Sequence, residues 1–192
     1  MDPRTRLIDL ILEKSYREGD FTLSSGAKSS FYIDLKATTL SAVGARLIGE
    51  LAISDLRTGG ILDRTEGVGG LTLGADPIAT AVSLASLGRS NAAEGIPAFL
   101  VRKESKGHGT GRFIEGLENL RPNSGLVIVE DVSTTGKSAM QAVERVRDAG
   151  FHILAVLTVV DREQGAADFF SAKGIPFISL LRLSDLQSRY RR

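Results

Sequence analysis

The sequence contains no cysteine, which excludes disulfide bridges, thiolate catalysis and metal sites built on cysteine sulfur. It also has no apolar run that approaches the length of a membrane-spanning helix. The N-terminal stretch MDPRTRLIDLILEK keeps charged residues throughout and lacks a small-residue cleavage site, so it does not resemble a signal peptide. We therefore expect a cytoplasmic protein that has no membrane partner.

Net charge and aromatic content are low as well. The formal charge is +1 at pH 7, and aromatic residues make up 6% of the chain. Proteins that bind nucleic acids usually present a basic face, and RNA-binding surfaces add aromatic platforms. We expect no nucleic-acid partner, and any cationic site has to come from local clustering of basic residues.

The 192 residues are 42% hydrophobic and 24% charged, which is typical of one globular domain with a real core. Apolar strand-like runs near residues 65, 97, 126, 153 and 177 are separated by helical segments. This alternation predicts an α/β fold with a doubly wound, mostly parallel sheet flanked by helices, spanning about residues 60–182. The predicted helices cover residues 2–17, 38–56 with a cap at Thr38 or Thr39, 139–149, one that starts near Asp76, and a short one from Ser184.

One stretch, LVIVEDVSTTGKS at residues 126–138, combines a strand, two acids and a polar turn. The apolar run 126–129 predicts a buried parallel strand that ends at Glu130 and Asp131. The turn after it leads into a helix, whose free N–H groups and dipole favour an anion such as phosphate. Carboxylates instead accept hydrogen bonds from hydroxyls. A phosphorylated ribose carries a phosphate for the turn and a vicinal diol for the two carboxylates, so it would suit the whole stretch.

Two other interpretations of this stretch have to be considered. Gly136, Lys137 and Ser138 match the second half of a Walker A motif, but the position of its leading glycine is occupied by Asp131. A carboxylate there would face the phosphates. The second alternative is an ordinary capped helix N-terminus with two acids at the surface.

A second segment, RKESKGHGTGRFIEG at residues 102–116, is rich in both cations and glycines. A run of charges is often only a solvated surface, but the interleaved glycines and the position after a predicted strand at 96–101 argue against that. A mobile cationic loop suits a reaction that expels a highly charged leaving group, because closure excludes water and brings positive charge to the developing anion.

Polar residues follow two further predicted strands. The glycine-rich segment 64–74 permits backbone N–H groups to approach a second anion, although a plain tight connection to a helix has the same pattern. Asp161 and Arg162 follow the apolar run 153–160, so they should emerge at the same sheet edge as the acid pair. They form either a salt bridge or, through the planar guanidinium, a site for a carboxylate.

The string EDVSTTGKS closely resembles the signature that binds phosphoribosyl pyrophosphate (PRPP) in the type I phosphoribosyltransferases. The strings R-K-x-x-K-x-H-G, D-R-x-x-G and F-T-L-x-S-G-x-x-S-x-[YF]-[YF] narrow the resemblance to the orotate phosphoribosyltransferases. This resemblance covers essentially the whole chain. It implies transfer of phosphoribosyl from PRPP to orotate, which gives orotidine 5-monophosphate and pyrophosphate in de novo pyrimidine (UMP) biosynthesis. It also implies a small N-terminal hood, residues 1–37, that covers the base.

The resemblance also implies roles for particular residues. The implied catalytic residues are Lys106, His108 and Asp131. Those implied to bind PRPP are Arg102, Lys103, Lys106, His108, Glu130, Asp131, Val132, Ser133, Thr134, Thr135, Gly136, Lys137 and Ser138. Those implied to contact orotate are Tyr32, Thr134 and Arg162. Magnesium is expected to arrive with the pyrophosphate and not in a dedicated protein site, because Mg²⁺ prefers phosphates and several waters to an all-protein cage.

The resemblance also implies a partner subunit, and this chain lacks two lysines that are common in the family. In the family the cationic loop of one subunit closes over the neighbour's active site, which implies a homodimer. Many members carry a lysine where this chain has Ser24, and often another where it has Leu73. Lys28 and Lys36 are the nearby cations that could compensate for the missing one at Ser24.

Two different functions would share parts of this pattern. A phosphoribosyltransferase for a purine would have the same ribose turn but not the R-K-x-x-K-x-H-G loop. A non-catalytic regulator that senses PRPP and binds RNA or DNA should have a basic face with aromatic platforms. The basic residues of this chain are concentrated in a glycine-rich loop, which favours the enzyme.

Overall fold

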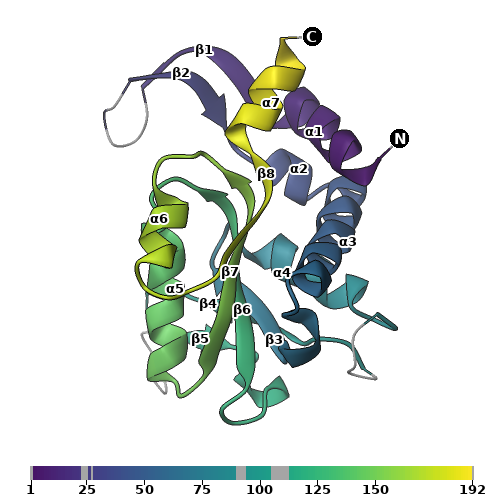
Figure 1. The fold of residues 1–192 in the computed structure, drawn as a ribbon, viewed down its shortest axis with the longest axis vertical. Helices are drawn as coiled ribbons and strands as arrows, with labels where there is room; N and C mark the ends of the chain where they lie inside the picture. Colours follow the sequence, from purple (N-terminus) through teal and green to yellow (C-terminus); the bar gives the residue numbers. More distant parts are fainter. Residues whose placement is uncertain (1, 23–25, 27, 90–93, 105–112, 192) are drawn as a thin grey trace.

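The computed structural model describes residues 2–22, 26, 28–89, 94–104 and 113–191. Its centre is a sheet of six strands in the order β5-β4-β3-β6-β7-β8 (Figure 1). The strands are β3 (Gly67–Leu71), β4 (Ala98–Val101), β5 (Ile114–Glu115), β6 (Gly125–Ser133), β7 (His152–Asp161) and β8 (Phe177–Arg182). All neighbours pair in parallel except β4 and β5. The predicted doubly wound, mostly parallel sheet is confirmed. β5 was not predicted, because two residues are too few to show a periodic pattern.

The direction of winding changes between β3 and β6. From β3 the chain proceeds to β4 on one side, whereas from β6 it proceeds to β7 and β8 on the other. In open α/β sheets, ligands bind in the crevice outside the carboxyl ends of the strands at such a switch point. The polar segments that follow β3 and β6 both lie at this place in the fold.

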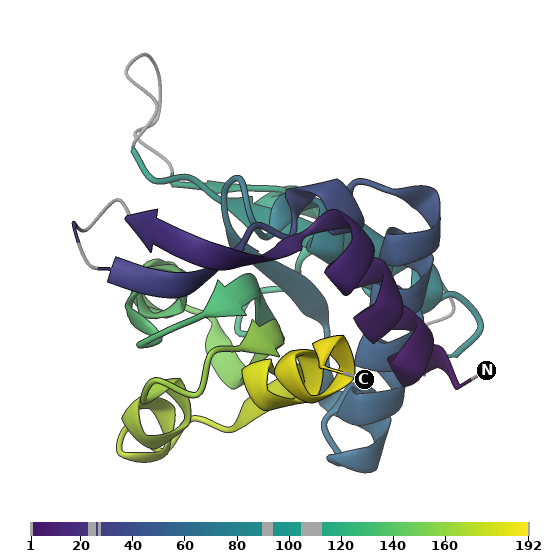
Figure 2. The ribbon, with the colours of Figure 1, turned by 90° about the horizontal axis from the view of Figure 1, so that it is seen from above.

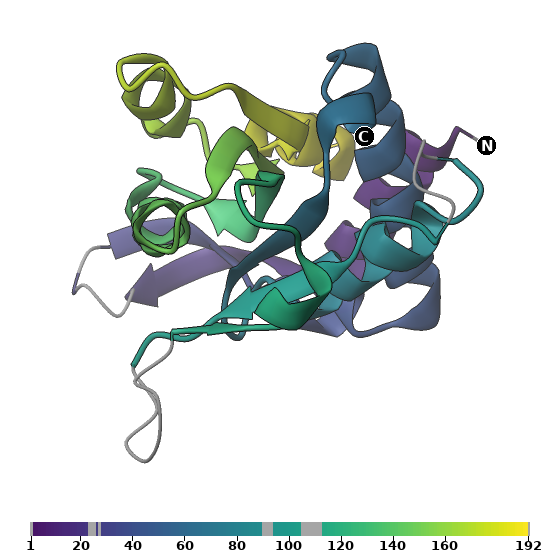
Figure 3. The same ribbon diagram turned by 90° about the horizontal axis from the view of Figure 1, so that it is seen from below.

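Helices cover both faces of the sheet (Figure 3). One apolar core gathers side chains from the sheet and from α1 (Pro3–Lys14), α3 (Ala42–Thr58), α4 (Asp76–Ala85) and α7 (Leu183–Tyr190). The other includes side chains of α5 (Lys137–Asp148) and α6 (Ala166–Ser171). Residues of β6 alternate between the two cores, since Val127 and Val129 belong to the first and Leu126 and Ile128 to the second. These four are at most 1% exposed, as predicted for a strand buried on both faces.

The predicted end of this strand is wrong, because β6 continues through the acid pair to Ser133. Glu130 pairs with Thr158 of β7, and Ser133 pairs with Asp161. The apolar run stops at Val129, but backbone pairing with the longer β7 does not. The two acids therefore stand on a strand, held by its hydrogen bonds, and not in a free turn.

The N-terminal segment forms a separate two-stranded sheet of β1 (Tyr16–Thr22) and β2 (Lys28–Ile33), which are antiparallel (Figure 2). The sequence predicts short strands at 21–23 and 31–35, but both observed strands begin earlier. The predicted helix 2–17 ends early, at Lys14. Tyr16 is buried between Phe31, with ring centres 6.0 Å apart, and Tyr190 of α7, at 5.5 Å. The C-terminal helix α7 thus packs in part against the hairpin through Tyr190.

The predicted helix over residues 38–56 is divided into α2 (Lys36–Thr39) and α3. Ser41 caps α3, because its hydroxyl accepts a hydrogen bond from the Gly44 N–H at 3.1 Å. Thr38 and Thr39, the predicted caps, are instead buried. Leu40, an apolar residue within the predicted helix, is 71% exposed and does not join the core.

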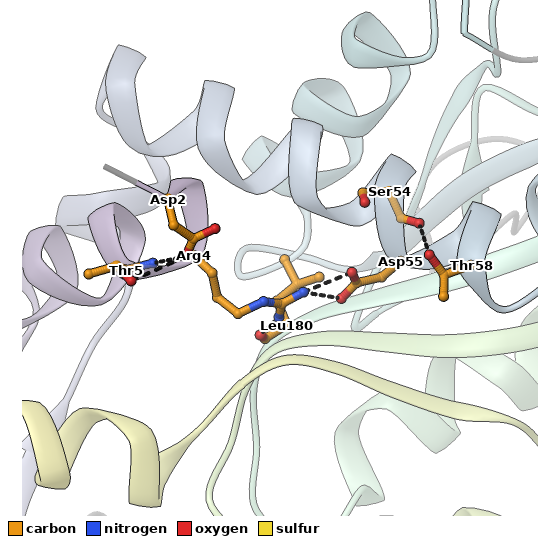
Figure 4. Close-up of polar contacts among 7 residues, drawn as sticks. All are labelled: Asp2, Arg4, Thr5, Ser54, Asp55, Thr58 and Leu180. Carbon is orange, nitrogen blue, oxygen red and sulfur yellow. Dashed lines mark hydrogen bonds and ion pairs between the residues drawn. The ribbon is translucent and has the colours of Figure 1, made fainter.

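Arg4 links α1 to helix α3 and strand β8 through hydrogen bonds (Figure 4). Its guanidinium donates to both carboxylate oxygens of Asp55 on α3, at 2.8 and 3.0 Å, and to the carbonyl of Leu180 on β8. Asp2 caps the same helix by accepting from the Thr5 N–H at 2.9 Å. Short 3-10 turns occur at Leu62–Arg64 and Leu117–Asn119. In the described ranges, none of the helices has both the length and the apolar character needed to traverse a bilayer.

Candidate active site

The acid pair stands at the switch point, and its two carboxyl groups have different surroundings. Glu130 is only 7% exposed, and its Oε2 has no hydrogen-bond partner among the described residues. Burial raises the pKa of Glu130 to about 8, and the negative charge of Asp131 adds to the effect. Asp131 is half-buried, and its Oδ1 accepts from the Val132 N–H at 2.8 Å. The alternative of two surface acids is therefore wrong for Glu130.

The turn between β6 and α5 leaves hydrogen-bond donors available for an anion. Gly136, at φ +79°, is the N-cap residue of α5, and no side chain caps this helix. A Cβ at Gly136 would lie 2.7 Å from the ring of Phe170, so only glycine fits there. The hydroxyl of Ser133 is buried without a partner among the described atoms. Thr134 is half-buried, while the other side chains of the turn and first helical turn are exposed: Thr135, Lys137 and Ser138.

The segment after β3 meets the acid pair directly. A Cβ at Gly74 would lie 2.7 Å from Oδ1 of Asp131 and 2.8 Å from its Cγ. The glycine therefore permits the loop 72–75 (the glycine loop) to pass against the carboxylate. The other glycines of the predicted segment 64–74 lie in strand β3 and not in a loop: Gly67, Gly69 and Gly70. Leu73, the residue next to it, is 72% exposed. No sequence pattern predicted the contact, because the two residues belong to segments that follow different strands.

Arg162 emerges beside the acid pair, as predicted for parallel β6 and β7. Its N–H donates to the carbonyl of Ser133 at 2.9 Å, and its guanidinium lies 4.8 Å from the centre of the Phe31 ring in the hairpin. Burial lowers the pKa of Arg162, and its Nε has no partner among the described residues. Asp161 instead accepts from the Glu163 N–H at 2.9 Å. The planar cation is thus positioned by backbone and by an aromatic face, with a donor left to bind an anion.

Lys36 lies where the hairpin, the glycine loop and the acid pair approach one another. Its Nζ is 2.7 Å from Oδ1 of Asp34, and this hydrogen bond raises the pKa of Lys36, with smaller electrostatic contributions from Asp131 and Tyr32. It also lines a cleft of about 530 Å³ together with Leu73. By contrast, Lys28 donates to the hydroxyl of Thr22 at 2.9 Å, within the exposed part of the hairpin.

The remaining predicted residues lie partly outside the described chain. Lys106, His108 and the Ser24 position fall among residues that are not described. Lys103 is exposed, but its positive charge opposes the raised pKa of Glu130, so the two lie within electrostatic range. Arg102 forms an ion pair with Glu115 at 3.2 Å. Tyr32 is 45% exposed, with its ring 5.7 Å from that of Phe21.

Carboxylate and imidazole groups do not gather into a metal cage in the described residues. None of the groups of three or more His, Cys, Asp or Glu side chains in that part of the chain is arranged to hold an ion. Glu130 and Asp131 are two adjacent carboxylates beside a glycine loop and an open helix N-terminus. Because burial raises the pKa of Glu130 to about 8, Asp131 is the acid that would offer oxygen to Mg²⁺, and phosphates and water would supply the other ligands.

Known proteins with similar sequences and structures point to one activity. The chain is 48% identical over 187 residues to an orotate phosphoribosyltransferase of Nostoc sp., covering 97% of this chain and 86% of the relative. A crystal structure of the orotate phosphoribosyltransferase of Mycobacterium tuberculosis superposes with a TM-score of 0.80 at 42% identity, covering 96% of this chain and 99% of the other. Another structure of that enzyme, in complex with PRPP, has a TM-score of 0.77 at 39% identity. The match covers 97% of this chain and 99% of the other. No family model matches the sequence.

Proposed function

This chain belongs to the orotate phosphoribosyltransferase family, and from that membership we propose how its own residues divide the work. The reaction transfers phosphoribosyl from PRPP to orotate: the bond from C1 to the pyrophosphate oxygen breaks, a bond from C1 to N1 of orotate forms, and N1 releases its proton. The products are orotidine 5-monophosphate and pyrophosphate, which leaves with the bonding electron pair. The observation that carries the assignment of residues is the contact between Asp131 of the acid pair and Gly74 of the glycine loop at the switch point.

We propose that the acid pair and the turn after it hold the phosphoribosyl group. Glu130 and Asp131 accept hydrogen bonds from the ribose 2- and 3-hydroxyls, and the negative charge of Asp131 favours the cationic character that develops at C1. The 5-phosphate binds at the end of β6, in the turn 134–136 and at the uncapped N-terminus of α5, a stretch that runs from Val132 to Ser138. The unpartnered hydroxyl of Ser133 and the positive φ of Gly136 support this division.

Orotate is proposed to bind between the β7 exit and the hairpin, which serves as the hood over the base. Arg162 binds the orotate carboxylate, because its guanidinium offers two donors in one plane. Tyr32 covers the pyrimidine ring, and Thr134 contacts it from the turn. The stacking of Arg162 on Phe31 supports this proposal, because it fixes the guanidinium at the boundary between hood and sheet.

Cationic residues are proposed to stabilise the pyrophosphate as it leaves. Lys106 and His108 stabilise or protonate it, and Arg102 and Lys103 bind it. Magnesium accompanies the pyrophosphate and offsets part of its charge. No step of the transfer requires a resident metal ion.

Lys36 is the better of the two cations to compensate for the lysine missing at Ser24. It lines the cleft with Leu73 and carries its charge near Asp131 and Tyr32, whereas Lys28 bonds to Thr22 on the hairpin. We expect its ammonium to leave Asp34 and bind the diphosphate of PRPP. The ion pair with Asp34 is half-exposed, so exchanging it for a phosphate costs little.

The protein is proposed to be a homodimer in which each 102–116 loop serves the neighbouring site. Several large apolar side chains are exposed around the clefts between α2, α3 and α4: Leu40, Val43, Leu73, Leu84 and Leu87. We propose that a second copy of the chain covers this patch. A loop shared between subunits requires an interface close to the active site, and Leu73 lies in the glycine loop beside Asp131. An interface there brings the partner next to the active site. A cytoplasmic location stays a prediction from the sequence.

Steady-state kinetics of Lys106→Ala test the proposed division of roles. If Lys106 stabilises the leaving pyrophosphate, its loss lowers kcat by roughly 100-fold or more while the KM values for PRPP and orotate change much less. A kcat equal to that of the wild type would contradict the role. Assays with purines in place of orotate test the alternative of a purine phosphoribosyltransferase, which would convert a purine and not orotate.

A further inference from the structure

One arginine of α5 binds both ends of the segment that separates β4 from β5. Nη1 of Arg145 donates to the carbonyl of Arg102, and Nη2 donates to the carbonyl of Lys103 at 2.8 Å. The same guanidinium lies over the ring of Phe113, 4.4 Å from its centre. Arg102 and Lys103 precede residues 105–112, and Phe113 follows them. A single side chain thus contacts the polypeptide on both sides of this segment.

The backbone alone gives these two ends little support. The β4–β5 ladder has only two residue pairs, Leu100 with Glu115 and Val101 with Ile114. Beyond it the Arg102 N–H donates to the Phe113 carbonyl at 2.8 Å. A ladder this short is marginal by itself. The contacts of Arg145 extend it towards the last described residues before the segment.

The geometry needs arginine and not merely a positive charge. A guanidinium is planar, presents several N–H donors in a fixed fork and can stack on an aromatic ring at the same time. The ammonium of lysine is a compact point charge, which cannot reach two successive carbonyls while a flat face covers Phe113. The substitution Arg145→Lys would therefore keep the positive charge but lose the fork.

The same helix reaches the proposed phosphate site. The N-terminus of α5 follows Gly136, and Arg145 is about two turns further along the helix. Lys103, whose carbonyl Arg145 binds, acts electrostatically on Glu130. One rigid element therefore connects the turn that would bind the 5-phosphate with the base of the cationic segment.

We propose that Arg145 is a positioning residue, which fixes both ends of the segment carrying Lys106 and His108 relative to the phosphate-binding turn. It touches no reacting atom. This inference rests on the proposed function, because the roles of Lys106 and His108 belong to that proposal. Its consequence is that loss of Arg145 impairs turnover without removing any substrate contact.

The test compares Arg145→Gln and Arg145→Lys with the matched control Arg147→Gln, which changes an exposed arginine of the same helix. We expect kcat for orotidine 5-monophosphate formation to fall about tenfold or more in both Arg145 variants and to stay at the wild-type value in the control. The dissociation constant of ribose 5-phosphate, a probe that lacks the pyrophosphate, should be unchanged in all three. Trypsin should cleave after Arg102 or Lys103 faster in the Arg145 variants than in the control.

Three results would overturn the proposal. These are a wild-type kcat in Arg145→Gln, full recovery of kcat in Arg145→Lys, and equal loss of ribose 5-phosphate binding and kcat, which would indicate a disrupted helix. A wild-type protein that does not convert orotate would contradict the proposed function instead. The tryptic comparison would still decide whether Arg145 holds the segment.

Discussion

Gly74 and Asp131 touch across the switch point of the sheet, where the loop after β3 passes against the carboxylate on β6. A Cβ on Gly74 would lie 2.7 Å from Oδ1 of Asp131, closer than side-chain carbons approach an oxygen. The absence of a side chain at Gly74 therefore sets the position of one of the two acids proposed to hold the ribose.

Gly74→Ala should displace the Asp131 carboxylate and weaken PRPP binding by about tenfold or more, because a charge-assisted hydrogen bond to the ribose is lost or misaligned. Titration calorimetry with PRPP measures this. Gly59→Ala is the control, because the nearest atom to its new Cβ would be at 3.3 Å and lies on α3, away from the acid pair. Equal affinities for PRPP in the two variants would show that the contact has no influence on the site.

Glu130 should make stability depend on pH. Its carboxyl ionises at about 4.5 in the unfolded chain and at about 8 in the folded protein, so between these values only the folded state keeps the proton. The contribution of Glu130 to the free energy of unfolding therefore falls as pH rises through this window, by at most about 1.4 kcal/mol per pH unit, and is constant above it.

Thermal unfolding of the ligand-free protein between pH 5 and 9 measures the effect. Glu130→Gln removes the titrating group, so the Tm of this variant should rise relative to that of the wild type as pH increases towards 8. Glu118→Gln, which changes an exposed acid, should follow the wild type throughout. Parallel curves for Glu130→Gln and the wild type would mean that the buried carboxyl does not hold its proton.

Lys36→Gln should raise the KM for PRPP about tenfold and leave the KM for orotate unchanged, because we assign its charge to the diphosphate. Lys28→Gln is the matched control, a lysine of the hairpin that bonds to Thr22. Steady-state kinetics with each substrate varied in turn separate the two assignments. A higher KM for orotate alone would place the Lys36 ammonium on the base and not on the diphosphate.

Mixing two inactive variants tests whether the 102–116 loop serves the partner's site. Lys106→Ala and Asp131→Asn damage different parts of the site, so a mixed dimer with exchanged loops contains one intact site. Random reassociation should restore up to about a quarter of the wild-type activity. Activity that stays at the level of the separate variants, although mixed dimers form, would assign each loop to its own subunit.

Local sequence patterns correctly predicted the elements that depend only on residues close together in the sequence. The apolar run 126–129 is a buried strand, and Asp76 begins a helix. The acids, the turn and Arg162 were expected at one edge, and parallel pairing of β6 with β7 brings them there.

Features set by distant residues could not be predicted from local patterns. β6 extends to Ser133 because β7 offers partners that far, and Glu130 is buried although acids are usually exposed. The contact of Gly74 with Asp131 and the binding of Arg145 to Arg102 depend on how separate elements pack. No periodicity within either segment encodes such a contact.

The most direct test of the central claim is a spectrophotometric assay of orotate consumption by the wild-type protein. With PRPP and Mg²⁺ present, orotate should disappear as pyrophosphate forms, the rate should collapse when either PRPP or Mg²⁺ is omitted, and adenine, guanine and hypoxanthine should not be converted. If orotate persists in the complete mixture, or if a purine is converted in its place, the assignment is contradicted.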